Sequence, residues 1–75
     1  MPETYEYLDA QDKNAIVVNH IRNLEYSMFT SEISIAMENL ASVPNETTID
    51  GFTKEITDAK AKIVALKAKI EPINP

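Results

Sequence analysis

The stretch FTKEITDAKAKIVALKAKI, residues 52–70, decides the fold. Its apolar residues recur at spacings of four and three, the pattern of a helix that packs along another helix. The set comprises Phe52, Ile56, Ala59, Ile63, Leu66 and Ile70. Lysines border this set on both sides, where their long stems cover apolar surface while the ammonium groups stay in water. The pattern predicts a coiled-coil-like helix with one face committed to a partner.

Proline and glycine divide the chain into two helical segments. Neither residue occurs between Asp9 and Val43, so this span is expected to form one long helix with Asp9 as its N-cap. Pro44 disfavours a helical backbone at the residue before it and ends that helix. The second helix is expected to follow a short polar loop, with Thr48 or Asp50 as its cap. The expected single domain runs as an extended arm (1–8), a long helix (9–43), a loop (44–48), a shorter helix (49–71) and a tail (72–75).

The long helix carries two apolar stripes, roughly 120° apart by the 100° step of a helix. One stripe comprises Val17, Ile21, Leu24, Met28 and Ile35, and the other comprises Phe29, Ile33, Ala36 and Leu40. A single partner helix cannot cover both. We predict that the Phe29–Leu40 stripe forms the seam with the second helix. The Val17–Ile35 stripe, together with Tyr5 and Tyr7 of the arm, is the predicted interface for a protein partner.

The short loop favours an antiparallel arrangement of the two helices. In the expected register Leu40 lies near Phe52, and Phe29 lies near Ile63. The alternative is a parallel homodimer of the second helix, which would bring Lys62 of one chain close to Lys67 of the other, an unfavourable contact. The predicted fold is therefore all-α, an antiparallel two-helix hairpin.

Composition excludes several classes of function. The chain has 75 residues, no cysteine, one histidine and a net charge of −5. A core this small is marginally stable alone, which makes association the expected stabiliser. The acidic balance argues against nucleic-acid binding. No apolar run is long enough to span a membrane, and the first residues lack the features of a signal peptide, so we expect cytoplasmic synthesis.

No residue pattern points to catalysis, a metal or a cofactor. His20 is the only imidazole, and its helical neighbours at three and four residues include no carboxylate. General acid–base chemistry would need such a partner within a pocket. The serines and threonines form no nucleophile motif. We expect no enzyme activity, no metal site and no cofactor.

Three segments give the chain a general character similar to small helical accessory and structural proteins of tailed phages. They are the acidic opening Tyr5-Glu6-Tyr7-Leu8-Asp9, the segment Arg22-Asn23-Leu24-Glu25-Tyr26, and the segment Thr57-Asp58-Ala59-Lys60-Ala61-Lys62-Ile63. The resemblance implies a virion component present in many copies. The residues themselves favour a non-enzymatic assembly protein that forms an oligomer or joins a larger structure. A small regulatory or inhibitory protein-binding module is the alternative.

Overall fold

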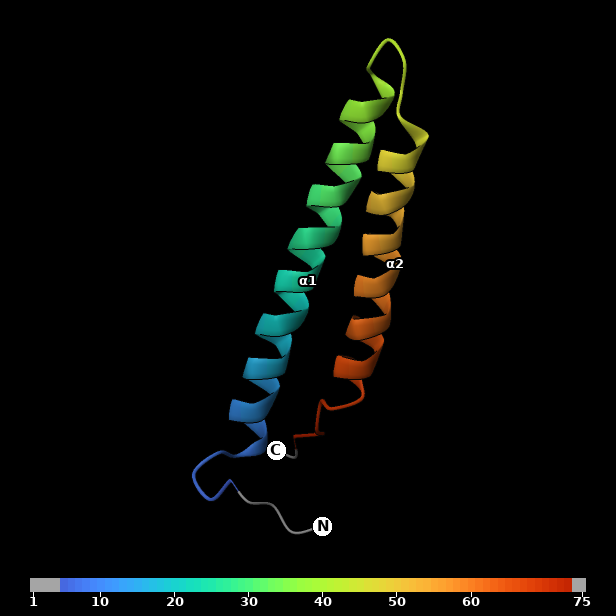
Figure 1. Ribbon diagram of the computed structural model, residues 1–75. Coiled ribbons are helices and arrows are strands. Elements are labelled where there is room, and N and C mark those ends of the chain that lie inside the picture. Colours follow the sequence, from blue (N-terminus) through green and yellow to red (C-terminus); the bar gives the residue numbers. More distant parts are fainter. Residues whose placement is uncertain (1–4, 74–75) are drawn as a thin grey trace.

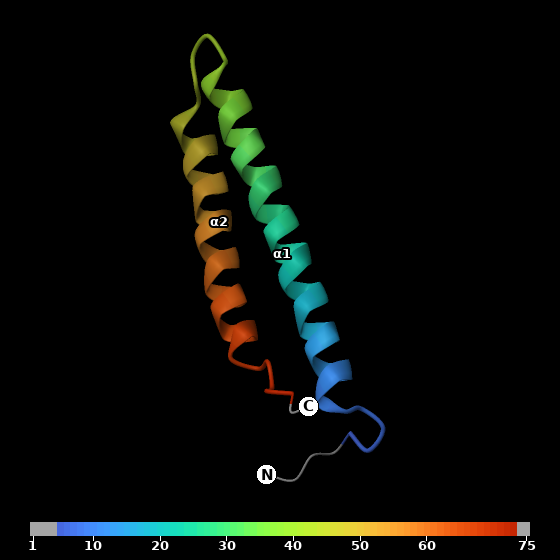
Figure 2. The ribbon, with the colours of Figure 1, turned by 180° about the vertical axis from the view of Figure 1, so that it is seen from behind.

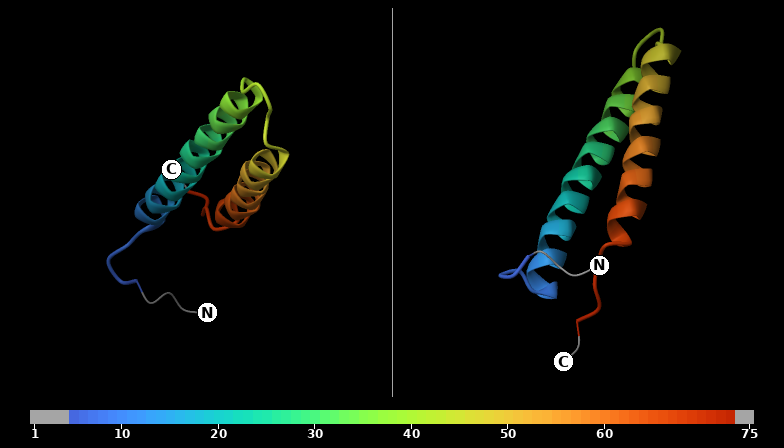
Figure 3. Two further views of the ribbon diagram at one scale, coloured as in Figure 1. Left: turned by 45° about the horizontal axis from the view of Figure 1, so that its top comes forward. Right: turned by 60° about the horizontal axis from the view of Figure 1, so that its bottom comes forward.

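The computed structural model describes residues 5–73 and shows an antiparallel pair of helices (Figures 1 and 2). Helix α1 spans Ala10–Asn39 and helix α2 spans Glu46–Lys67, and the described residues contain no strand. The two helices remain side by side in the rotated views of Figure 3, with the connecting loop at one end. The predicted all-α two-helix hairpin is confirmed.

Helix α1 begins with a capping box made by two aspartates. The Asp9 side chain accepts a hydrogen bond from the Asp12 backbone N–H at 2.8 Å, and the Asp12 side chain accepts one from the Asp9 N–H at 3.4 Å. These bonds satisfy N–H groups that have no partner within the helix. Both carboxylates also lie at the positive end of the helix dipole. Asp9 is thus the N-cap, as the sequence predicts.

The loop is placed differently from the prediction. Helix α1 ends at Asn39 rather than residue 43, and α2 begins at Glu46 rather than residue 49. Asn45 explains the early start of α2, because its side chain accepts from the Thr48 N–H at 3.1 Å and caps the helix before Thr48 could do so. The Asn45 N–H in turn donates to Glu38 Oε1 at 2.8 Å, which ties the loop back to the last turn of α1.

Helix α2 ends at Lys67 with Ala68 as its C-cap, earlier than the predicted end at residue 71. The following segment is held against the start of α1. The Asn14 side chain donates to the Glu71 carbonyl at 2.7 Å and accepts from the Glu71 N–H at 2.8 Å. Lys13 Nζ lies 3.4 Å from Glu71 Oε2. We call this group of contacts the tail clasp.

The side of α1 that faces α2 is not the one predicted. Ile21 and Ser31 are buried, and Val17, Leu24, Met28 and Ile35 are half-buried. By contrast, Phe29 is 63% exposed, Ile33 48% and Leu40 79%, and Ala36 is also exposed. The prediction that Phe29, Ile33, Ala36 and Leu40 form the seam is therefore wrong.

The lengths of the two stripes explain why α2 packs against the Val17–Ile35 stripe rather than the Phe29–Leu40 stripe. With Ser31 included, the positions from Val17 to Ile35 keep an alternating spacing of four and three, which matches the seven-residue pattern of α2. That stripe runs beside most of α2, whereas a stripe from Phe29 to Leu40 would leave half of α2 uncovered. The expected register is wrong for the same reason. Ser31 donates to Glu55 at 3.2 Å, so Ile63 lies about two turns further toward the start of α1 than Phe29.

Helix α2 presents a single covered face. Ala59 and Ile63 are buried, and the half-buried residues of the helix are Ile49, Phe52, Ile56 and Leu66. Ile70 lies beyond the end of α2 and is 41% exposed. The hydrophobic core is small, because only Ile21, Ala59 and Ile63 among the described apolar residues are buried. The molecule is correspondingly elongated, with dimensions of 56 × 22 × 18 Å.

Candidate protein-binding surface

A row of large apolar side chains lies on the α1 face opposite the seam. We call it the outer stripe, and it comprises Tyr26, Phe29, Ile33, Met37 and Leu40. These side chains are between 48% and 79% exposed. Their spacing of three and four residues places them on one side of the helix, roughly half a turn away from Ile21 and Leu24. The outer stripe is therefore a continuous apolar surface that the hairpin itself does not cover.

Acidic side chains predominate along this part of α1. Between residues 23 and 43 the charged side chains are Glu25, Glu32 and Glu38, with no lysine or arginine, and Arg22 lies one turn before Tyr26 on the same side of the helix. Membrane-surface helices carry basic residues beside their apolar face, and nucleic-acid interfaces need a basic footprint. The outer stripe meets neither requirement, and its chemistry fits a protein surface.

The two predicted interface sets have different locations in the structure. Val17, Ile21, Leu24, Met28 and Ile35 lie on the side of α1 that faces α2, where Ile21 is buried and the other four are half-buried. The hairpin itself therefore covers most of this stripe. Tyr5 and Tyr7 lie at the opposite end from the loop and are 61% and 89% exposed. The Tyr5 backbone carbonyl accepts a hydrogen bond from the Leu8 N–H at 3.5 Å, and Tyr5 borders a hollow together with Leu8 and Ile16.

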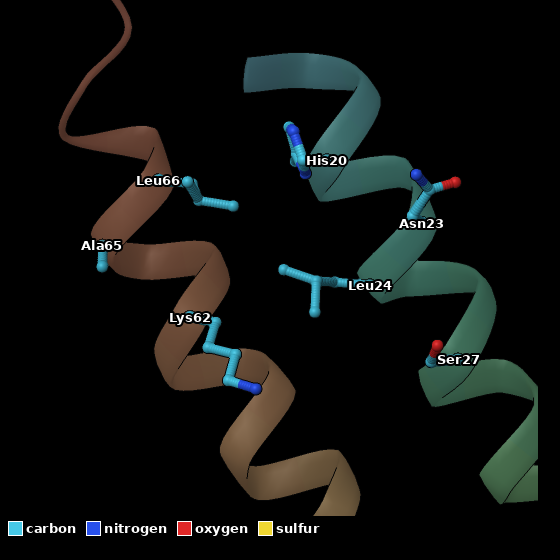
Figure 4. A pocket seen from close by; sticks show the side chains of 7 residues that line it. All are labelled: His20, Asn23, Leu24, Ser27, Lys62, Ala65 and Leu66. Atoms are coloured by element: carbon cyan, nitrogen blue, oxygen red, sulfur yellow. The ribbon is translucent and has the colours of Figure 1, made fainter. Parts of the chain in front are cut away.

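An open groove runs along one side of the helix pair (Figure 4). Its lining residues are His20, Asn23, Leu24, Ser27, Lys62, Ala65 and Leu66. Leu24 and Leu66 point toward each other across it, and His20 stands at its rim. No carboxylate lines the groove, so His20 lacks there the acidic partner that a proton-transfer pair would use. Within residues 5–73, no three His, Cys, Asp or Glu side chains cluster to hold a metal ion.

The hairpin exposes much more surface than a compact monomer of its mass. A folded monomer of 8.4 kDa is expected to expose about 4600 Å², whereas this chain exposes 6238 Å². Its Cα radius of gyration is 17.4 Å, against about 11 Å for a compact domain of this length. The excess surface, roughly 1600 Å², is of the size that one chain buries in a large protein–protein interface.

Three features of the folded hairpin differ from, or are absent in, the expectations from the sequence. The outer stripe was assigned to the seam, and only the unbroken spacing through Ser31 could have indicated the reverse. The partly buried bond from Ser31 to Glu55 has no local sequence signal, since the two residues come from different helices. The contact of Asn14 with Glu71 joins residues 57 positions apart, a separation that helix periodicity does not address.

Across the part of the chain that the structure describes, no helix has the length and apolar character needed to cross a membrane.

Comparison with known proteins identifies no relative of this chain. No protein-family model, curated protein or solved structure matches this chain.

Proposed function

We propose that this protein is a non-enzymatic assembly protein that buries the outer stripe against other protein subunits. The observation that carries the proposal is the exposed surface: five large side chains in one row, on a chain that exposes about 1600 Å² more than a compact monomer. Contiguous apolar surface of this kind marks interaction sites in soluble proteins. The partner is either the same chain or a larger structural protein.

The weak core of the hairpin supports the same conclusion. Three buried apolar side chains provide little burial to offset the conformational entropy of about 70 ordered residues. Anything that binds the folded chain and not the unfolded one adds its binding free energy to the stability. Association would therefore supply the stability that the isolated hairpin lacks.

A more specific role as a virion component of a tailed phage belongs to this proposal. It rests on the sequence resemblance of the Tyr5–Asp9, Arg22–Tyr26 and Thr57–Ile63 segments. An elongated hairpin with one free face is a suitable shape for repeated attachment to a capsid or tail. Localisation in the virion would follow from that attachment.

Measuring mass by light scattering and helicity by circular dichroism, across a wide concentration range, tests the proposal. An assembly subunit should have a mass above that of one chain, and should lose both mass and helicity on dilution. A cooperatively folded monomer whose helicity does not depend on concentration would contradict the proposal, because such a chain needs no partner.

A small regulatory or inhibitory module is the second candidate. It is favoured by the position of the outer stripe on a single helix, which is the geometry of a helix that docks into the groove of another protein. In that case the isolated chain should be a weakly helical monomer at every concentration, since its partner is a different protein. The same two measurements therefore separate a self-associating subunit from a chain whose partner is a different protein.

A further inference from the structure

We infer that the outer stripe binds the outer stripe of a second copy of this chain, with the two α1 helices antiparallel and a two-fold axis beside Ile33. The inference rests on the proposed assembly function and names the partner and the geometry. The observations that lead to it are the symmetry of the stripe, the position of Arg22 and the area available.

The outer stripe is symmetric about its central residue. Phe29 and Met37 lie four residues on either side of Ile33, and Tyr26 and Leu40 lie seven residues on either side. An antiparallel copy therefore places Ile33 against Ile33, Phe29 against Met37, and Tyr26 against Leu40. Each layer outside the axis combines an aromatic with an aliphatic side chain, and all five side chains are exposed in the single hairpin. Such self-complementarity is what a two-fold interface requires.

Arg22 opposes the parallel arrangement. It lies one turn before Tyr26 on the same side of α1 and is exposed. In a parallel, in-register pair each Arg22 would face its own counterpart across the interface, and like charges in that position are repulsive. In the antiparallel pair Arg22 lies beyond Leu40 of the copy, past the end of its α1, where it remains in water.

The chain as a whole exposes enough surface for such a pair. A stable protein–protein interface takes about 800 Å² from each partner, and the exposed excess of the entire chain, to which the outer stripe contributes, is roughly twice that. The acidic rim does not prevent the pairing. Glu32 is exposed beside the axis, where repulsion between two solvated carboxylates costs little.

Single-cysteine variants test the arrangement, because the natural chain has no cysteine. Under mild oxidation Ile33→Cys should give disulfide-linked dimers. Tyr26→Cys alone should not, while a mixture of Tyr26→Cys and Leu40→Cys should give the mixed dimer. Val64→Cys, exposed on α2 at 69%, measures random collision. Efficient linking of Tyr26→Cys to itself, or no linking of Ile33→Cys above the Val64→Cys level, would overturn the antiparallel pair.

The variant Ile33→Glu provides a second readout with intact folding contacts, since Ile33 lies outside the seam. Its mass should fall to half that of the wild-type dimer at the same concentration, and Val64→Glu should leave the dimer mass unchanged. An oligomer that tolerates Ile33→Glu would overturn this inference and leave the assembly function standing. A wild-type chain that is a folded monomer at every concentration would overturn both. A weakly helical monomer would overturn the second-copy inference and favour a different protein partner.

Discussion

Ile63 and Ala59 are the residues of α2 that the hairpin covers most completely, at 9% and 7% exposed. Val64 follows Ile63 in the chain, lies about 100° further around the same helix and is 69% exposed. The two positions share a β-branched apolar residue, a helix and a distance from the helix ends. They differ only in whether the side chain meets α1, which makes them a matched pair for measuring the seam.

We expect Ile63→Asp to abolish cooperative folding. A carboxylate at this position would be buried without a partner, and the loss of about 4 kcal/mol or more would exceed the stability of so small a core. Val64→Asp carries the same change in helix propensity and should lower the unfolding free energy by no more than about 1 kcal/mol. Circular dichroism during urea denaturation measures both. Equal melting curves for the two variants would show that Ile63 does not hold the helices together.

At the level of the helices, the seam contains one polar position within an apolar series. Ser31 is 6% exposed and donates to Glu55, whose carboxylate is exposed. Ser31 occupies a position of the Val17–Ile35 stripe but adds no large apolar side chain there. Its bond to Glu55 holds the Ser31 hydroxyl against α2. Because Glu55 can return to water, the bond is less costly to lose than one between two buried groups.

We therefore expect Ser31→Ala to leave the unfolding free energy unchanged, or to raise it by up to about 1 kcal/mol. The lost hydrogen bond is offset by the higher helix propensity of alanine and by removal of a buried hydroxyl. Ser27→Ala, at an exposed position of the same helix, isolates the propensity effect in the same urea experiment. A Ser31→Ala variant less stable than Ser27→Ala by more than about 1 kcal/mol would mean that the bond to Glu55 is a main stabiliser of the seam.

The tail clasp gives a second prediction at this scale. Asn14→Ala removes both hydrogen bonds to the Glu71 backbone. It should lower the free energy of detaching the tail from α1 by about 1–2 kcal/mol. The loss should be local, so the Glu71 amide should exchange with deuterium faster in NMR while amides in the middle of α2 keep their protection. Asn23→Ala, at an exposed position of α1, is the control. Unchanged exchange at Glu71 would show that the clasp does not hold the tail in solution.

The sequence predicted the helices more accurately than the surface between them. Helix α2 has one apolar stripe, so its covered face could be read from the spacing alone. Helix α1 has two stripes, and periodicity does not say which one meets α2. The choice depends on the length of the contact and on treating Ser31 as part of the stripe. The start of α2 depends on Asn45, whose local bond to the Thr48 N–H follows the known preference of asparagine for N-cap positions. The tail depends on Asn14, whose bonds to Glu71 form only in the folded arrangement.

For the whole molecule, charge and shape act against each other during association. The elongated hairpin offers a long apolar face, while each chain carries a net charge of −5. In the proposed pair, two copies would repel at long range, while their outer stripes would attract at contact. Because salt screens exposed charges and leaves apolar contact in place, ionic strength should shift the balance toward the assembled state.

We expect the dissociation constant of the self-associated form to fall as sodium chloride is raised through the physiological range. Glu32→Gln should tighten association at low salt, and its advantage should shrink as salt increases. Glu46→Gln, which removes an exposed charge in the first turn of α2 away from the outer stripe, should have a smaller effect. Analytical ultracentrifugation provides the constants. Weaker association at high salt would indicate that ion pairs, rather than the apolar stripe, hold the copies together.

The tail clasp also determines how the hairpin responds to mechanical load. It joins the start of α1 to the segment after α2, at the end of the molecule opposite the loop (Figure 1). A force that pulls the start of α1 away from the segment after α2 would act first on the Asn14–Glu71 pair. Once that pair breaks, the contacts of the seam would separate one side-chain layer at a time, from Val17 toward Ile35. Force applied along the length of α1 would instead shear all layers together, so the molecule should be weak in the first direction and strong in the second.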